Sequence, residues 1–123
     1  MKRGDKVASG AYLYRRGYNS PERKYLNPDG SATSRVFKLR EKDKGKLSVD
    51  IQSLTTPEKA VLDPTQYNLF ILKNQVVESI GLETIYDADY QAKDRSHCLI
   101  IGMEFNDETK PAYLVKQSRK IFP

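Results

Sequence analysis

Ser96-His97-Cys98-Leu99-Ile100-Ile101-Gly102 is the stretch around which the fold is predicted to be organised. Its apolar centre is rich in branched residues and has polar neighbours on both sides, which is typical of a short buried strand. Leu99, Ile100 and Ile101 leave no polar face. We therefore expect a central strand that is covered by other elements on both of its faces.

The single histidine and the single cysteine of the chain are neighbours in this stretch. Side chains alternate between the two faces of a strand, so His97 and Cys98 cannot together ligate a metal or form a nucleophile pair without a bulge. We predict that Cys98 is a small core residue. For His97 we predict a half-exposed position and a structural hydrogen bond, with a functional role as the alternative because histidine titrates near neutral pH.

The chain has 123 residues, a length that suits one domain with one core. We predict a flexible basic N-terminus at residues 1–10, without the apolar segment of a secretory signal, and a single domain at residues 11–123. No apolar run approaches the roughly 20 residues that span a bilayer. One cysteine cannot form an internal disulfide, so the predicted location is the cytoplasm.

The net charge of +5 is unevenly distributed along the sequence. Residues 1–46 carry 13 Lys and Arg against 5 Asp and Glu, residues 47–109 carry 4 against 11, and residues 110–123 carry 4 against none. This segregation predicts a molecule with a basic and an acidic side. Neutralisation of the basic termini by the acidic middle of the chain is the alternative.

Five segments are predicted to be strands, because they alternate or are rich in β-branched and aromatic residues: 11–15, 34–39, 47–51, 83–87 and 96–102. Residues 16–30 form a long loop with turn chemistry near its end, and residues 40–46 form an exposed turn. Thr56 and Pro57 are suited to open a short helix.

The main helix is predicted at residues 64–80, between the start signal Asp63-Pro64 and the stop signal Gly81. A strand at 68–72 followed by a helix at 74–80 is the competing interpretation. Residues 112–122 are predicted to form an amphipathic C-terminal helix. Together these elements predict an α+β domain with a mixed, mainly antiparallel sheet of about five strands and one long central helix.

Several standard chemistries are missing from the sequence. It has no glycine loop followed by Lys-Ser or Lys-Thr for phosphate, and no paired cysteines for zinc. Asp87, Asp89 and Asp94 lack the glycine and the final glutamate of a calcium loop, so we interpret them as a solvated acidic turn. We predict no metal and no cofactor.

The basic N-terminal part interleaves cations with tyrosines. Cations bind phosphates and aromatic rings stack on unpaired bases, although tyrosine and arginine are also enriched at protein interfaces. No known nucleic-acid module signature is present. The predicted binding surface consists of Tyr12, Tyr14, Arg15, Arg16, Tyr18, Arg23, Lys24, Arg35 and Lys38. An ordinary basic surface is the alternative.

A second group combines hydroxyls with cations and could hold a phosphate or a nucleotide. It comprises Ser31, Thr33, Ser34, Arg35 and Lys38, with Arg15 or Arg16 and His97 beside them. An arginine at the end of a first strand with serines on a later strand faintly resembles ADP-ribosyltransferases. The glutamate motif of that family is not evident here.

Four short motifs carry a broader resemblance: Leu13-Tyr14-Arg15-Arg16, Ser34-Arg35-Val36-Phe37-Lys38, Leu47-Ser48-Val49-Asp50 and the stretch 96–102. In this order they resemble a group of small uncharacterised bacterial proteins. The resemblance implies a stand-alone bacterial cytoplasmic protein and a shared constellation of Arg15, Ser34, Asp50 and His97. It implies no particular activity. The charge asymmetry would suit a component of a defence or toxin–antitoxin locus.

The sequence therefore favours a non-catalytic accessory module of a bacterial multi-component system. The module is expected to contact a protein partner or nucleic acid through its basic Tyr/Arg-rich surface, and no membrane. The alternative is a small nucleotide- or phosphate-directed enzyme, ADP-ribosyltransferase-like or toxin-like, that uses Arg15, Ser34, Asp50 and His97.

Overall fold

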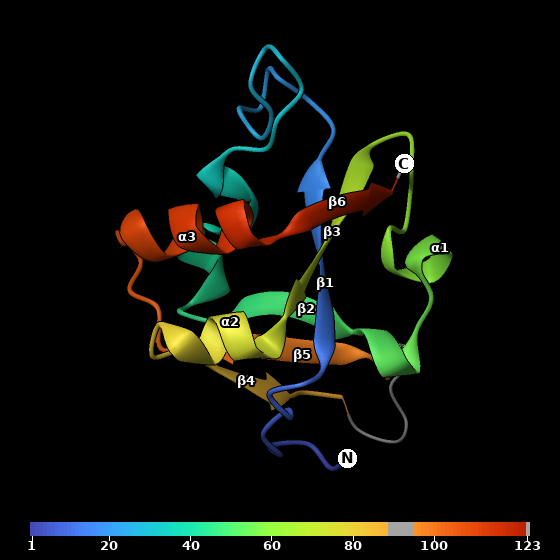
Figure 1. The fold of residues 1–123 in the computed structure, drawn as a ribbon, viewed down its shortest axis with the longest axis vertical. Coiled ribbons are helices and arrows are strands. Elements are labelled where there is room, and N and C mark those ends of the chain that lie inside the picture. Colours follow the sequence, from blue (N-terminus) through green and yellow to red (C-terminus); the bar gives the residue numbers. More distant parts are fainter. Residues whose placement is uncertain (89–94, 123) are drawn as a thin grey trace.

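One antiparallel sheet organises the computed structural model, which describes residues 1–88 and 95–122 (Figure 1). Its six strands are β1 Tyr12–Tyr18, β2 Leu47–Ile51, β3 Tyr67–Lys73, β4 Glu83–Tyr86, β5 His97–Ile101 and β6 Arg119–Phe122. They lie in the order β4-β5-β2-β1-β3-β6. The predicted α+β class is confirmed. The predicted mixed sheet of five strands is wrong, because all neighbouring strands are antiparallel and a sixth strand is present.

The two faces of the sheet are covered unequally. Helices α2 Asn74–Ser79 and α3 Thr109–Gln117 and the short 3₁₀ helix η1 Ser34–Phe37 pack on one face, which we call the helix face. The larger core lies there and combines Leu13, Leu47, Val49, Phe70, Cys98 and Ile100 with Val36, Phe37, Val77 and Leu114. On the other face, here called the open face, the described residues form a small cluster around Tyr14 and Leu69, which includes Ala60 of the short helix α1 Pro57–Ala60.

The alternation of apolar and polar side chains along β2 explains why one face of the sheet carries the larger core. Leu47, Val49 and Ile51 enter the larger core, whereas Ser48 and Asp50 belong to the open face. The strand predicted at 47–51 is confirmed. The short helix opened by Thr56 and Pro57 is also confirmed, and the Thr56 hydroxyl accepts a hydrogen bond from the Lys59 amide at 3.3 Å.

The long helix predicted at 64–80 is wrong, and the competing strand-plus-helix interpretation describes the chain. Residues 67–73 form β3, which pairs with β1 over its whole length, and α2 begins at Asn74. The apolar residues of β3 lie on both faces, so their spacing satisfies a helical period as well as a strand period. The Asp63 carboxylate does not cap a helix but accepts from the amide and hydroxyl of Thr65 in a turn.

The predicted C-terminal helix at 112–122 is also only partly correct. Helix α3 begins at Thr109, where the Asp107 carboxylate accepts the amides of Thr109 and Lys110, and it ends at Gln117. Residues 119–122 then form β6 along β3. The β3 edge would otherwise leave unpaired backbone groups, and pairing with β6 satisfies them.

Two further expectations need correction. The strand predicted at 34–39 contains the 3₁₀ helix η1, whose N-cap Thr33 accepts from the Arg35 amide. Strand β5 is not covered on both sides. Cys98 and Ile100 are buried on the helix face, whereas His97, Leu99 and Ile101 are half-exposed on the open face, where none of the described helices packs on them.

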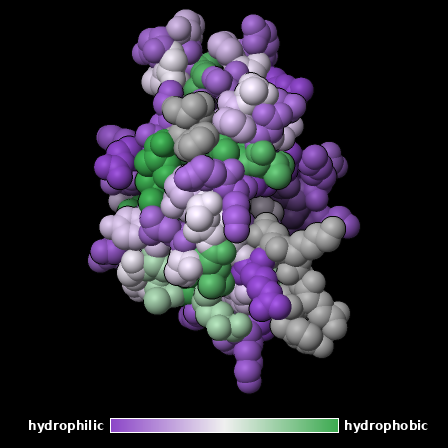
Figure 2. All heavy atoms as spheres, turned by 90° about the vertical axis from the view of Figure 1, so that its right-hand side faces the viewer, coloured by the Kyte–Doolittle hydropathy of each residue, from purple (hydrophilic) through white to green (hydrophobic). Residues whose placement is uncertain are grey.

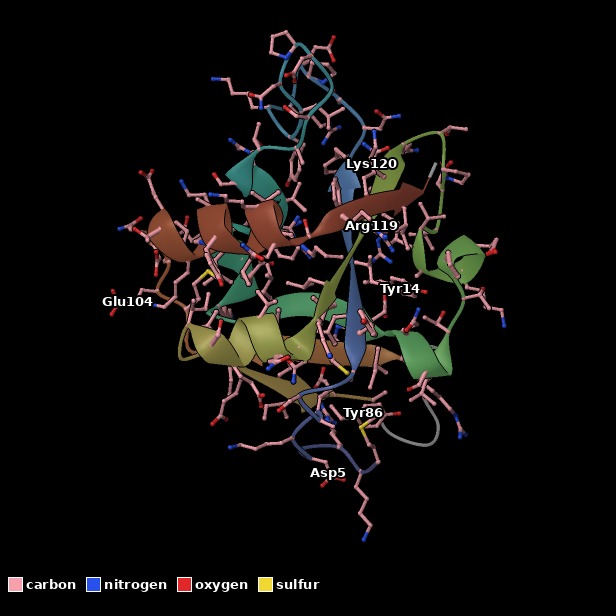
Figure 3. The ribbon with its side chains drawn as sticks, in the orientation of Figure 1. Asp5, Tyr14, Tyr86, Glu104, Arg119 and Lys120 are labelled. Carbon is pink, nitrogen blue, oxygen red and sulfur yellow. The ribbon has the colours of Figure 1, made fainter. Side chains whose placement is uncertain are left out.

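The N-terminal segment contacts the domain. Val7 is buried, its amide donates to Thr84, and the Tyr86 amide donates to the Asp5 carbonyl at the edge strand β4. Asp5 and Tyr86 lie close together at the lower end of the molecule in Figure 3. Among residues 1–88 and 95–122, no helix has the length and apolar character needed to cross a membrane.

Candidate nucleic-acid interface

A groove of about 720 Å³ lies beyond the end of β1, and we call it the basic groove. Its lining contains six cations and one carboxylate, together with three aromatic rings and one leucine: Tyr18, Glu22, Arg23, Lys24, Tyr25, Arg35, Lys38, Leu39, Arg40, Lys42 and Phe105. Such an excess of positive charge in a concave surface concentrates the electrostatic potential and attracts polyanions.

The loop at residues 19–33, which projects at the top of Figure 1, forms one wall of the groove. Leu26 and Ala32 form an isolated β-bridge, and the Thr33 amide donates to the Tyr25 carbonyl. The turn between them has Gly30 at φ +89°, a conformation that glycine adopts without strain. These bonds hold the loop against η1, so the cations on both segments face one groove.

Aromatic rings and guanidinium groups alternate at the inner end of the groove. The Arg23 guanidinium carbon lies 4.2 Å from the centroid of the Tyr18 ring. Tyr18 contacts Tyr25 edge to face, with ring centroids 5.3 Å apart. Arg35 lies over Tyr25 at 5.9 Å. These contacts hold the guanidinium groups in place by cation–π attraction while leaving their N–H donors available.

The cations of the groove differ in how far they are neutralised. Lys38 pairs with Glu108 at 3.4 Å, and Arg40 pairs with Asp43 at 3.1 Å. The hydrogen bond to Asp43 raises the pKa of Arg40; burial raises the pKa of Asp43, but its hydrogen bonds and attraction to Arg40 outweigh this and lower it. Within residues 1–88 and 95–122, no carboxylate lies at ion-pair distance from Arg23, Lys24, Arg35 and Lys42.

The structure divides the predicted binding surface into two sets. Tyr18, Arg23, Lys24, Arg35 and Lys38 line the basic groove. Tyr12, Tyr14, Arg15 and Arg16 do not. Tyr14 is buried on the open face near the middle of β1, as Figure 3 shows, and the Arg16 guanidinium donates to the Ala60 carbonyl there.

The contacts of Arg15 are with the protein's own backbone. Its guanidinium donates to the carbonyls of Val36 and Ser48 at 2.8 and 2.9 Å, and so ties η1 and β2 to β1. Burial lowers the pKa of Arg15 to about 10, because the charged form loses hydration. At neutral pH the group still carries its charge.

Arg15, Asp50 and His97, three of the four residues predicted for an enzyme, line one hollow of about 100 Å³, whereas Ser34 is not among its lining residues. Arg15 and Ser34 lie on the helix face, where Ser34 begins η1. Asp50 and His97 lie opposite each other on the open face, as a cross-strand pair of β2 and β5. Asp50 is buried and accepts from the Ser96 hydroxyl at 2.9 Å, with Arg16 at 3.7 Å.

Sequence reasoning missed part of the groove. Leu39, Arg40 and Lys42 line it, as does Phe105, whose side chain is about half exposed. The charge excess of residues 1–46 was a usable signal for the two cations. No local pattern marks Phe105, because it reaches the groove from the turn before α3.

Residues 1–88 and 95–122 contain no group of three or more His, Cys, Asp or Glu side chains arranged around a common point. Of the three aspartates considered for a cation, Asp89 and Asp94 lie outside the described residues. Asp87 pairs with His97 and Arg3.

Comparison with known proteins adds no relative. No protein-family model, no curated protein and no solved structure matches the chain. The functional argument therefore depends on the geometry and chemistry of the surface.

Proposed function

We propose that the basic groove is a non-catalytic binding site for single-stranded nucleic acid. The observation that carries the proposal is the combination of four cations without a carboxylate partner in the described ranges and a half-exposed phenylalanine in the same groove. Phosphates satisfy the cations, and an unpaired base can stack on the ring of Phe105. A duplex hides its base faces, so the aromatic component favours single strands.

The same groove could bind an acidic protein segment, and this is the main competing partner. The carboxylates of an acidic protein segment would pair with the cations. Such a segment lacks the regularly spaced flat bases that a nucleic acid can stack on Phe105 and on the arginine guanidinium groups. The aromatic rings therefore favour nucleic acid. The wider role that we propose is that of an accessory component in the cytoplasm of a bacterium, within a multi-protein system.

Binding to a labelled single-stranded oligonucleotide should depend steeply on salt. If all four cations contact phosphates, the slope of log K against log salt should be about −3, from about 0.7 per phosphate on a single strand. Fluorescence anisotropy of the full chain with mixed-sequence RNA and DNA strands, at several salt concentrations, measures this slope. Failure to bind any single strand at low salt, or stronger binding to a duplex of the same sequence, would contradict the proposal.

Replacing Phe105 with alanine should weaken binding about 10-fold without changing the salt slope. The expected loss corresponds to one base–aromatic stacking contact of about 1–3 kcal/mol. Tyr113→Ala is the matched control, because Tyr113 is also an exposed aromatic residue but does not line the groove. Equal losses for the two variants would show that Phe105 has no specific contact with a base.

A further inference from the structure

A chain of three hydrogen-bonding side chains crosses the open face of the sheet. The Asp87 carboxylate lies 3.1 Å from Nδ1 of His97, and Nε2 of His97 lies 3.2 Å from the Ser48 hydroxyl. The three residues come from three neighbouring segments: the end of β4, the start of β5 and β2. They are separate from the basic groove.

The partners of His97 determine where its proton lies. An ionised carboxylate only accepts hydrogen bonds, so the neutral imidazole carries its proton on Nδ1, facing Asp87. Nε2 then has a free lone pair and accepts the hydroxyl proton of Ser48. This is the order of groups that activates a serine nucleophile: a carboxylate orients the histidine, and the histidine acts as the base.

The backbone and a neighbouring cation hold this arrangement in place. The Asp87 amide donates to the His97 carbonyl at 3.0 Å, which extends the β4–β5 ladder by one residue. The Arg3 guanidinium lies 3.4 Å from the second oxygen of Asp87. The two contacts together place the Asp87 carboxylate between Arg3 and His97.

The serine is accessible and lies beside two hollows. Ser48 is exposed, and the side chains of His97 and Asp87 are 32% and 26% exposed. Ser48 and His97 line a hollow of about 100 Å³, and a second hollow of about 470 Å³ shares Arg16 and Asp50 with it. Leu54 and Leu62, both exposed, line the larger hollow together with residues of α1. Figure 2 shows the molecule from the α1 side, where apolar and hydrophilic side chains are interspersed.

We propose that Ser48 is the nucleophile of a second, hydrolytic site that accepts carboxylic esters with an apolar acyl chain. Oγ of Ser48 bonds to the ester carbonyl carbon while Nε2 of His97 takes the hydroxyl proton. The bond from the carbonyl carbon to the alcohol oxygen then breaks, and the alcohol leaves with that proton. Water attacks the acyl-serine in the same way, and the site returns to its starting state with release of the carboxylic acid.

Arg16 is the cation that both hollows share. Its guanidinium is fixed by the Ala60 carbonyl at 2.8 Å and by Asp50 at 3.7 Å. In this proposal its positive charge stabilises the negative charge that develops on the ester carbonyl oxygen in the transition state. The apolar acyl chain lies along Leu54 and Leu62.

Labelling with a fluorophosphonate probe tests the nucleophile directly, because an activated serine displaces fluoride from phosphorus. We expect one label on the full chain, within the tryptic peptide 47–59 and on Ser48. His97→Ala and His97→Gln should each slow labelling about 100-fold or more, as expected when a general base is lost. Ser53→Ala is the matched control, because Ser53 lies exposed in the same peptide and should not affect the label.

Hydrolysis of p-nitrophenyl butyrate provides the second readout. Ser48→Ala should abolish hydrolysis while leaving oligonucleotide binding unchanged. Absence of the label, a label on another serine, or labelling and hydrolysis that persist in both folded His97 variants would overturn the proposal.

Discussion

Replacing Arg23 and Arg35 together with glutamate is expected to lower the affinity for a single-stranded oligonucleotide by at least about 100-fold at low salt. Each guanidinium lies on a tyrosine ring of the basic groove, and no carboxylate pairs with either in the part of the chain that the structure describes. A hydrogen bond to a charged group contributes about 1.5–3 kcal/mol, so the loss of two gives about two orders of magnitude or more.

The salt dependence of this double variant distinguishes the mechanism. Two lost phosphate contacts should reduce the magnitude of the slope by about 1.4. Lys59→Glu combined with Arg119→Glu is the matched control, since it makes the same change in net charge at exposed positions outside the groove. Arg119 lies on β6, as labelled in Figure 3.

Similar losses for both double variants would show that net charge, rather than the groove, attracts the strand. Unchanged binding in Arg23→Glu/Arg35→Glu would remove the groove from the interface altogether. Far-ultraviolet circular dichroism of each variant confirms that the comparison is made between folded proteins. Both arginine side chains extend from exposed residues, so their replacement should leave the core intact.

Elements whose pattern fits only one period could be predicted from the sequence. Leu47-Ser48-Val49-Asp50-Ile51 alternates strictly, and β2 has the bounds that this alternation predicts. Gly81 ends α2 with φ +81°. The prediction of one helix that includes Tyr67 to Ile80 was wrong because β3 has apolar residues on both faces. Their spacing fits the period of a helix as well as that of a strand, and only the pairing with β1 decides between the two.

The candidate sites could be predicted only in part, for a similar reason. Alternation places Ser48 and Asp50 on one face of β2 and His97 on one face of β5, but it does not reveal that the two strands are neighbours. The hydrogen bond between Ser48 and His97 forms only because β2 and β5 are neighbours in the sheet. Likewise, residues 23–42 are visibly basic in the sequence, whereas the loop folding that gathers their charges around Tyr18 and Tyr25 depends on contacts distant in sequence.

Truncating Phe37 to alanine should lower the free energy of unfolding by about 3–5 kcal/mol, as is typical for a buried phenylalanine. Phe37 is fully buried at the end of η1, where it packs with Leu114 and the sheet residues of the larger core. Such a loss is a large part of the total stability of about 5–15 kcal/mol expected for one domain. Urea unfolding followed by circular dichroism measures it.

The same segment links the core to the basic groove, because Arg35 lines the groove while Val36 and Phe37 anchor η1 beneath it. Arg35→Ala, two residues away and exposed, should change stability by no more than about 0.5 kcal/mol while weakening binding. Phe37→Leu should lose less stability than Phe37→Ala, because it leaves a smaller cavity. A decrease in the free energy of unfolding of less than about 1 kcal/mol for Phe37→Ala would show that the buried residues of η1 do not anchor it. Other contacts would then have to hold this wall of the groove.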